Sequence, residues 1–162
     1  IIVNGEGYKK LQVEKGFLYG LGVTVKPVEG LTLRLYGDLN QRPDNGTPQK
    51  TLNVMAGYRH KRFSIAAEGN FSFDQSGTKE KNLSGFSAYA SVKAGRCDIF
   101  ARYDYLTSRN DWNKDKDGNL ALLGVEIPVF KWFRIAPNAR LWFPSSDAKT
   151  KPSAHVSLQF AL

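Results

Sequence analysis

The sequence is poor in residues that build covalent or metal-held frameworks. Among 162 residues there is one cysteine, Cys97, and there are two histidines, His60 and His155. A single cysteine cannot form an internal disulfide, and these scattered donors lack the spacing of a transition-metal site. A disulfide scaffold and a cysteine-rich zinc site are therefore excluded, and we expect neither a metal nor another cofactor.

Long apolar runs are missing as well. No window approaches 18 consecutive apolar residues, which excludes a transmembrane helix. Apolar residues at helical spacing are not sustained over 11 positions, so helices are not predicted as the main elements. Strands that cross a membrane remain compatible with the sequence, because they alternate polar and apolar residues and score poorly on hydropathy.

An alternation with a period of two runs through most of the chain. Leu31, Leu33 and Leu35 alternate with Thr32 and Arg34. The same pattern recurs over 52–59, 63–74, 86–93, 99–106, 133–143 and 153–162. It is typical of strands with one apolar and one polar face. The implied strands run about 10 to 13 residues, whereas strands of soluble proteins average about 5 to 6.

The connections alternate as regularly as the faces. Short ones are centred near residues 29, 61, 96 and 131, the third of them covering Gly95 to Asp98, and this repeat of about 34 residues fits a hairpin of long strands. Longer polar connections span 41–49, 75–82, 107–119 and 144–152. Together these features predict an all-β fold: an antiparallel up-and-down transmembrane β-barrel, one domain over 1–162, with short periplasmic turns and long outer loops. A soluble up-and-down barrel with its apolar face inward is the alternative.

Aromatic residues gather near the predicted strand ends on the apolar face. In a membrane barrel they would form the girdles that lie at the lipid–water interface. The predicted girdle residues are Phe17, Phe71, Phe73, Phe86, Tyr103, Tyr105, Trp132, Phe133, Phe143 and Phe160, and Phe130 and Trp142 are counted with the same strand-end aromatics.

Several segments resemble bacterial outer-membrane barrels. The last strand, 154–162, resembles the C-terminal strand that the assembly machinery recognises, although the chain ends in Leu162 where the family usually has an aromatic residue. The segments 124–140, 99–105 and 16–28 are similar to strand–turn–strand hairpins of Bacteroidetes-type porins. The resemblance implies a porin of the outer membrane that lets small solutes diffuse across.

No catalytic constellation emerges, and we predict that the chain is not an enzyme. Ser153 and His155 share a strand face, but no acidic residue is placed to orient the histidine. The segment 110–118 is similar to a calcium loop, yet it lacks the far-end acceptor and contains two lysines. We interpret it as a solvated outer loop and leave weak calcium binding open.

The formal net charge of +8 raises the question of an anionic partner. Many lysines fall in predicted turns and loops, where they meet solvent or anionic headgroups. Nucleic-acid binding needs charges and stacking aromatics on one face, and here they mostly occupy opposite faces. We therefore expect outer-membrane lipid and small solutes as partners and no nucleic acid, with a homo-oligomer or another outer-membrane protein left open.

The polar face supplies the candidate functional residues. The predicted pore-lining residues are Lys26, Arg34, Asp38, Arg59, Glu68, Lys93, Arg102, Asp104, Glu126, Arg134 and Arg140. The basic ones lie mostly near short turns, so we predict a partial basic ring at the periplasmic end and a modest anion preference. The alternative is that the charges pair across strands, with Glu126 binding either Arg102 or Arg134.

Strand direction adds one expectation. Nine strands can be counted, of which the first, near 16–27, runs downward, whereas closed bacterial barrels usually have an even number of strands. Ile1, Ile2 and Val3 look like the top of a preceding strand. We therefore expect a C-terminal part of a longer barrel. The function that fits best is a porin for small solutes, with a preference for anionic ones left open; the alternatives are a filled barrel with a structural or complex-associated role, and a soluble ligand-binding barrel.

Overall fold

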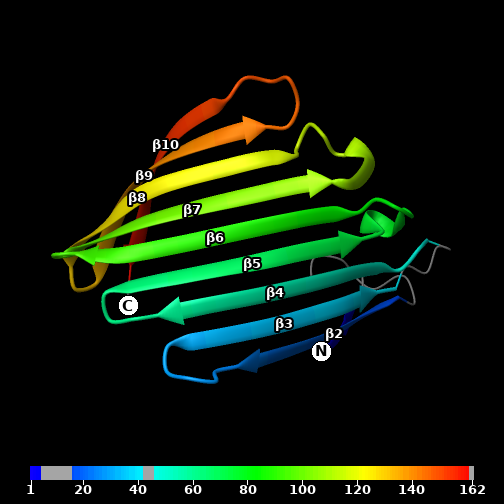
Figure 1. The fold of residues 1–162 in the computed structure, drawn as a ribbon, viewed down its shortest axis with the longest axis horizontal. Coiled ribbons are helices and arrows are strands. Elements are labelled where there is room, and N and C mark those ends of the chain that lie inside the picture. The colour runs from blue at the N-terminus through cyan, green and yellow to red at the C-terminus, as the bar shows by residue number, and fades with distance from the viewer. Residues whose placement is uncertain (5–15, 42–45, 161–162) are drawn as a thin grey trace.

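The computed structural model describes residues 1–4, 16–41 and 46–160, which form one antiparallel sheet (Figure 1). Its ten strands follow one another in chain order, so each strand pairs with its neighbours in the sequence. The strands are β1 (Ile2–Asn4), β2 (Phe17–Val25), β3 (Leu31–Asn40), β4 (Gln49–Arg59), β5 (Phe63–Phe73), β6 (Leu83–Ala94), β7 (Cys97–Ser108), β8 (Gly118–Phe130), β9 (Phe133–Pro144) and β10 (Lys151–Phe160). The prediction of an all-β, up-and-down architecture is confirmed.

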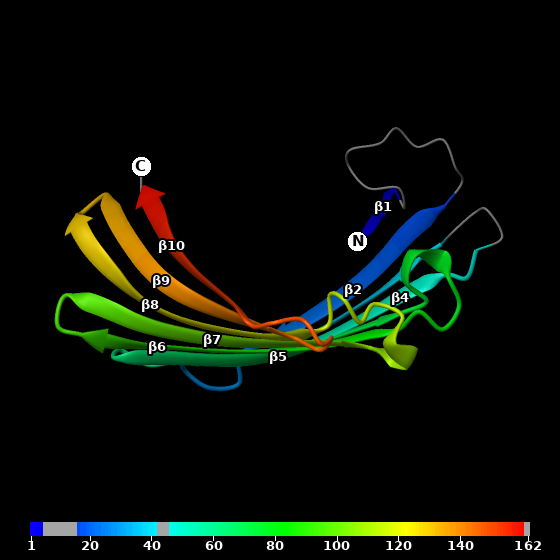
Figure 2. The same cartoon turned by 90° about the horizontal axis from the view of Figure 1, so that it is seen from above.

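The sheet is strongly curved but not closed. Figure 2 shows a trough whose middle strands form the floor and whose two ends, β2 and β10, rise on opposite sides. Along the open side, β1 pairs with β2 only over Phe17–Tyr19, and β10 pairs with β9 alone. No described helix is long and apolar enough to cross a membrane.

The polar face of the sheet is the concave one. Along β4, the side chains of Thr51, Asn53 and Met55 are half-buried, whereas those of Leu52 and Val54 are exposed. In a curved sheet the inward side chains crowd together and the outward ones spread apart, so the half-buried set points inward. Among the described residues no hydrophobic side chain is buried, and the convex face exposes a broad apolar surface.

The connections have the predicted alternation of lengths with shifted boundaries. The short turns span 26–30, 60–62, 95–96 and 131–132, and the long connections span 41–48, 74–82, 109–117 and 145–150. Cys97 and Asp98, predicted within a turn, begin β7 instead. Gly95 explains the tighter turn, since its φ of 66° lets the chain reverse over two residues.

The β7–β8 loop is packed rather than fully solvated. Asp117 is 2% exposed, and its carboxylate accepts hydrogen bonds from the Ser108 backbone N–H at 2.7 Å and from the Ser108 hydroxyl. Trp112 donates to the Asn82 carbonyl at 3.0 Å, which ties this loop to the one before β6. In the described part of the chain no three acidic, histidine or cysteine side chains gather as metal ligands.

Glycine at position 30 is required by the turn between β2 and β3. Its φ is +83°, and a Cβ there would lie 2.4 Å from the Arg59 carbonyl oxygen. Gly95 also has a positive φ, but a Cβ there would meet nothing within 4 Å. We predict that Gly95→Ala costs about 1–2 kcal/mol of unfolding free energy, the left-handed penalty alone, and that Gly30→Ala costs clearly more. Urea unfolding in detergent micelles measures both, and equal losses would contradict the steric argument.

Candidate functional site: the concave face

The concave face carries every charged residue predicted to line a pore. Paired positions share a face in an antiparallel sheet, so the register fixes their side. Arg34 on β3 is across from Met55 on β4, which is across from Glu68 on β5. Further round, Arg102 on β7 is across from Leu122 on β8, which is across from Arg140 on β9. Whether these residues line a conducting pore stays a prediction.

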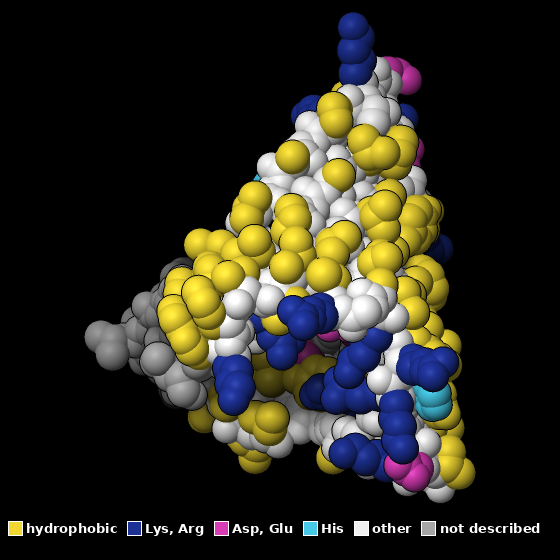
Figure 3. Space-filling view, turned by 90° about the vertical axis from the view of Figure 1, so that its left-hand side faces the viewer, with side chains coloured by type: hydrophobic (Ala, Val, Ile, Leu, Met, Phe, Trp, Pro, Cys, Tyr) yellow, Lys and Arg dark blue, Asp and Glu magenta, His cyan; other side chains and the backbone are white. Residues whose placement is uncertain are grey.

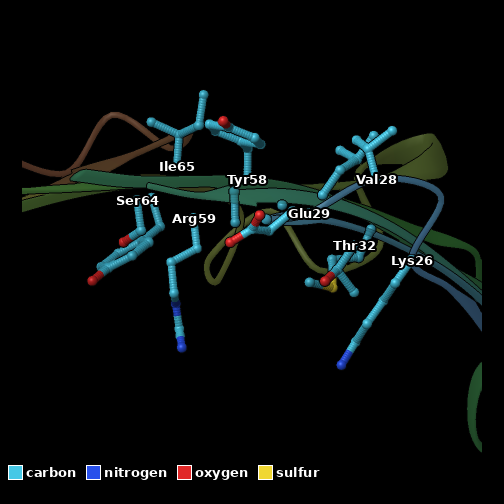
Figure 4. Close-up of a pocket in the computed structure, with 14 residues that line it drawn as sticks. Lys26, Val28, Glu29, Thr32, Tyr58, Arg59, Ser64 and Ile65 are labelled. Atoms are coloured by element: carbon cyan, nitrogen blue, oxygen red, sulfur yellow. The ribbon is translucent and has the colours of Figure 1, made fainter. Parts of the chain in front are cut away.

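Basic side chains gather at the short-turn end of the trough. Figure 3, which looks at this end, shows lysine and arginine around a hollow, while hydrophobic side chains cover the outer surface. Figure 4 shows Lys26 and Arg59 on the same side of the sheet as Ser64 and opposite Tyr58 and Ile65. These two basic residues line a groove of about 640 Å³ with Gly57, Ala66 and Tyr89. The small side chains on its floor leave room above the strands.

Two ion pairs form on this face, and they resolve the alternatives for Glu126. Arg134 Nη1 lies 2.5 Å from Glu126 Oε1. Arg102 instead pairs with Asp104 two positions along its own strand, with its Nε 2.8 Å from the carboxylate. The charges therefore pair in part. Within residues 1–4, 16–41 and 46–160, the basic side chains of Lys26, Arg34, Arg59 and Lys93 form no ion pair.

Neutral hydrogen bonds connect the strands between these charges. Asn53 donates to Asn70 across the β4–β5 pair at 2.6 Å, and Asn70 donates to Glu68 at 2.8 Å. Ser87 donates to Asp104 across the β6–β7 pair at 2.6 Å. Glu68 and Asp104 are thus held by short polar contacts within the sheet, whereas Lys26, Arg59 and Lys93 at the short-turn end form no ion pair among the described residues.

The predicted girdle aromatics lie on the convex face in two groups. Near the long connections are Phe17, Phe71, Phe73, Phe86, Tyr103, Tyr105 and Phe143, and near the short turns are Trp132, Phe133 and Phe160. In the second group Phe133 and Phe160 stack with centroids 4.9 Å apart. Sequence reasoning missed Tyr19, Tyr58 and Phe63, although alternation and closeness to a strand end would have identified them. A role at a lipid interface stays a prediction for all of them.

Trp142, predicted with the strand-end aromatics of the apolar face, lies on the concave face instead. It is across from Leu120 on one side and Lys151 on the other, in the row that continues to Asp104. Phe100 also points inward, because a Cβ at Gly124 would lie 2.4 Å from the Phe100 ring. The concave face is therefore polar over β3–β6 and partly apolar over β7–β9.

Comparisons with known proteins support the fold. No protein-family model matches the chain, and no curated protein sequence matches it. A solved structure described as "NanC porin structure in rhombohedral crystal form" is similar, with a TM-score of 0.64 and 10% identity, over 91% of this chain and 79% of that one. At this identity the likeness shows a porin-like β-sheet fold.

The coupling free energy between Arg134 and Glu126 depends on whether water reaches the concave face. Both side chains are partly exposed, at 48% and 28%. In contact with water, a double-mutant cycle with Arg134→Gln and Glu126→Gln should give a coupling of about 0.2–1 kcal/mol that falls with added salt. A coupling several times larger and insensitive to salt would show that this part of the face is sealed from water.

Proposed function

We propose that this chain forms the wall of an outer-membrane channel through which small solutes diffuse, rather than an enzyme. The observation behind the proposal is that the curved sheet has an apolar convex face and a polar concave face. The convex face exposes aliphatic side chains between two groups of aromatics, as a lipid-facing surface requires. The concave face presents charges and amides, as a water-filled path requires. The fold of the NanC porin supports the same interpretation, and the segments 99–105 and 124–140, through their resemblance to Bacteroidetes-type porins, support a porin of that type.

A membrane channel also needs closed strand edges. Unpaired backbone N–H and C=O groups facing hydrocarbon cost several kcal/mol each. The edge of β2 beyond β1 and the outer edge of β10 are unpaired in the described sheet. We propose that further strands of a longer barrel pair with these edges. The intact mass of the natural protein tests this, and a mature chain near 18 kDa would contradict it.

A filled barrel with a structural role is the second candidate. The inward side chains of Phe100, Leu122 and Trp142 favour it, because such residues pack the interior of narrow barrels. Reconstitution into planar bilayers separates the candidates. Stepwise ion currents support the channel, insertion without current supports the filled barrel, and solubility without detergent would support a soluble barrel instead.

Lipid exposure of the convex face is tested by placing a charge there. Leu35 lies on β3 and is 51% exposed on the convex face, and the same assignment covers Leu33, Val54, Ile65, Val92, Ile135, Leu141, Val156 and Leu158. We predict that Leu35→Arg costs about 2–4 kcal/mol of unfolding free energy in lipid vesicles if it lies near the bilayer midplane. Thr32→Arg, on the concave face of the same strand, should cost less than about 1 kcal/mol. Equal costs would contradict the proposed orientation.

Ion selectivity is the prediction from the unpaired basic side chains. Lys26 and Lys93 form no ion pair among the described residues. Both lie at the short-turn end of the trough, beside the turns 26–30 and 95–96. A positive potential there raises the local anion concentration. We predict a modest anion preference, measured as the reversal potential in a salt gradient, that shifts toward cations in the variant Lys26→Glu with Lys93→Glu.

The matched control carries the same charge change at the opposite end of the sheet. Lys79 and Lys149 lie in long connections and are exposed. The variant Lys79→Glu with Lys149→Glu should move the reversal potential far less. An unchanged reversal potential in the first variant would show that Lys26 and Lys93 do not set selectivity.

A further inference from the structure

Arg140 on β9 is an arginine held in place without a counter-charge. Its Nε donates to Asn138 Oδ1 at 2.9 Å, which fixes the side chain along the sheet. Asn138 is in turn 8% exposed and donates to the Ala136 carbonyl at 3.1 Å. In the part of the chain that the structure describes, no carboxylate pairs with Arg140. Four of its five N–H donors therefore keep no protein acceptor there.

The surroundings of Arg140 are apolar on one side. Leu122 is directly across from it on β8, and Trp142 is the next inward residue on its own strand. Leu120 is across from Trp142 and completes a four-residue arrangement on the concave face. We name Leu120, Leu122 and Trp142 the apolar shelf. The shelf is half-buried on the concave face and lies near the long connections, away from the groove at the short-turn end.

The ring of Trp142 leans toward Gly118 on β8. A Cβ at Gly118 would lie 3.0 Å from the Trp142 Cζ2 atom. Arg140 leans the opposite way, toward Asn138. The two leucines of the shelf are left between an aromatic surface and a cation.

The other arginine near the shelf is already neutralised. Arg102 is across from Leu122 on the β7 side, but both its contacts with Asp104 are ionic, at 2.8 and 2.9 Å. Among the described residues, Arg140 is therefore the uncompensated cation directly across from Leu122, and Lys151, exposed and across from Trp142 on the β10 side, is a second one near the shelf. A ligand that complements Arg140 and the apolar shelf has one carboxylate and an apolar group.

We propose that Arg140 and the apolar shelf form a binding subsite for small amphiphilic carboxylates, those that join a carboxylate to an aromatic or aliphatic group. The subsite deepens the proposed channel function, on which its role in transport rests. The carboxylate receives charge-assisted hydrogen bonds from the Arg140 guanidinium, and the apolar group covers Leu120, Leu122 and Trp142. Solutes of equal charge are then distinguished by their apolar surface, which a general electrostatic preference does not do.

Direct binding tests the subsite independently of conduction. The probe is 4-phenylbutyrate, whose carboxylate and ring are separated by three methylenes; inward neighbours on one strand, such as Arg140 and Trp142, are about 6–7 Å apart. Equilibrium dialysis against the full chain in detergent gives its affinity. Two reference solutes separate the contributions: gluconate keeps the charge and lacks the apolar body, and 4-phenylbutanol keeps the body and lacks the charge. We expect phenylbutyrate to bind at least tenfold more tightly than either.

Variants assign the binding to these residues. Arg140→Gln should weaken phenylbutyrate about tenfold and leave phenylbutanol unchanged, which also shows that the variant is folded. Leu122→Asn should weaken both ligands. Arg34→Gln makes the same charge change on β3, where Arg34 is across from Met55 and Thr24, and should alter neither.

Equal affinity for gluconate and phenylbutyrate would overturn the subsite, as would an Arg34→Gln variant that weakens binding as much as Arg140→Gln. The channel function is judged separately, by current in planar bilayers. Phenylbutyrate binding without current would keep the subsite and remove the channel, whereas current without selective binding would do the reverse. Where both hold, phenylbutyrate should interrupt the current of the wild-type channel and not that of Arg140→Gln.

Discussion

The backbone hydrogen-bond ladder between consecutive strands is the interaction on which this structure depends. The described residues bury no hydrophobic side chain, so apolar packing in a core does not hold the strands together as it does in most domains. Nine antiparallel pairings do so instead, seven of them with uninterrupted registers of eight to twelve partners. Such a sheet exposes one face entirely to its surroundings. Its apolar convex surface therefore requires an apolar covering, which the proposed membrane location would provide.

Much of the fold could be predicted from the sequence because successive side chains of a strand point to opposite faces, which gives the sequence a period of two residues. Alternation assigns each residue to a face once a strand is recognised, and Arg34 and Leu35 illustrate the result on the concave and convex sides. Strand order follows from connections too short for a strand to pair anywhere but with its neighbour. The apolar residues Ile1, Ile2 and Val3 indicated a strand before β2, and β1 (Ile2–Asn4) pairs with β2 there.

Other features of the structure cannot be predicted from the alternation of polar and apolar residues. The partner of Glu126 depends on the stagger of β8 against β9, which contains a register shift near Pro128, and alternation does not encode it. The turn boundary at Cys97 depends on the conformation of Gly95. Sequence reasoning interpreted 110–118 as solvated, but Asp117 is buried because its carboxylate closes the loop onto Ser108. Closure of the barrel likewise depends on edges whose partners the pattern of these residues does not specify.

The curvature of the sheet explains which side chains on the concave face are large and which are small. Bending a sheet brings inward side chains together, and a bulky inward group fits only where its neighbour is small. Tyr36 illustrates this, since its ring lies over Gly20 and Gly22 on β2, where Cβ atoms would come within 2.9 and 3.3 Å of it. Phe100 over Gly124 and Trp142 over Gly118 repeat the arrangement on β8. Glycine beside an aromatic residue lets the ring lie along the strands and cover backbone that would otherwise be bare. The inner surface thus stays shallow enough to leave a hollow while still carrying large apolar groups. A wall built in this way can combine a path for water with a place where an apolar solute body is held, and the residues that satisfy the geometry of the bend are then the ones available for recognition.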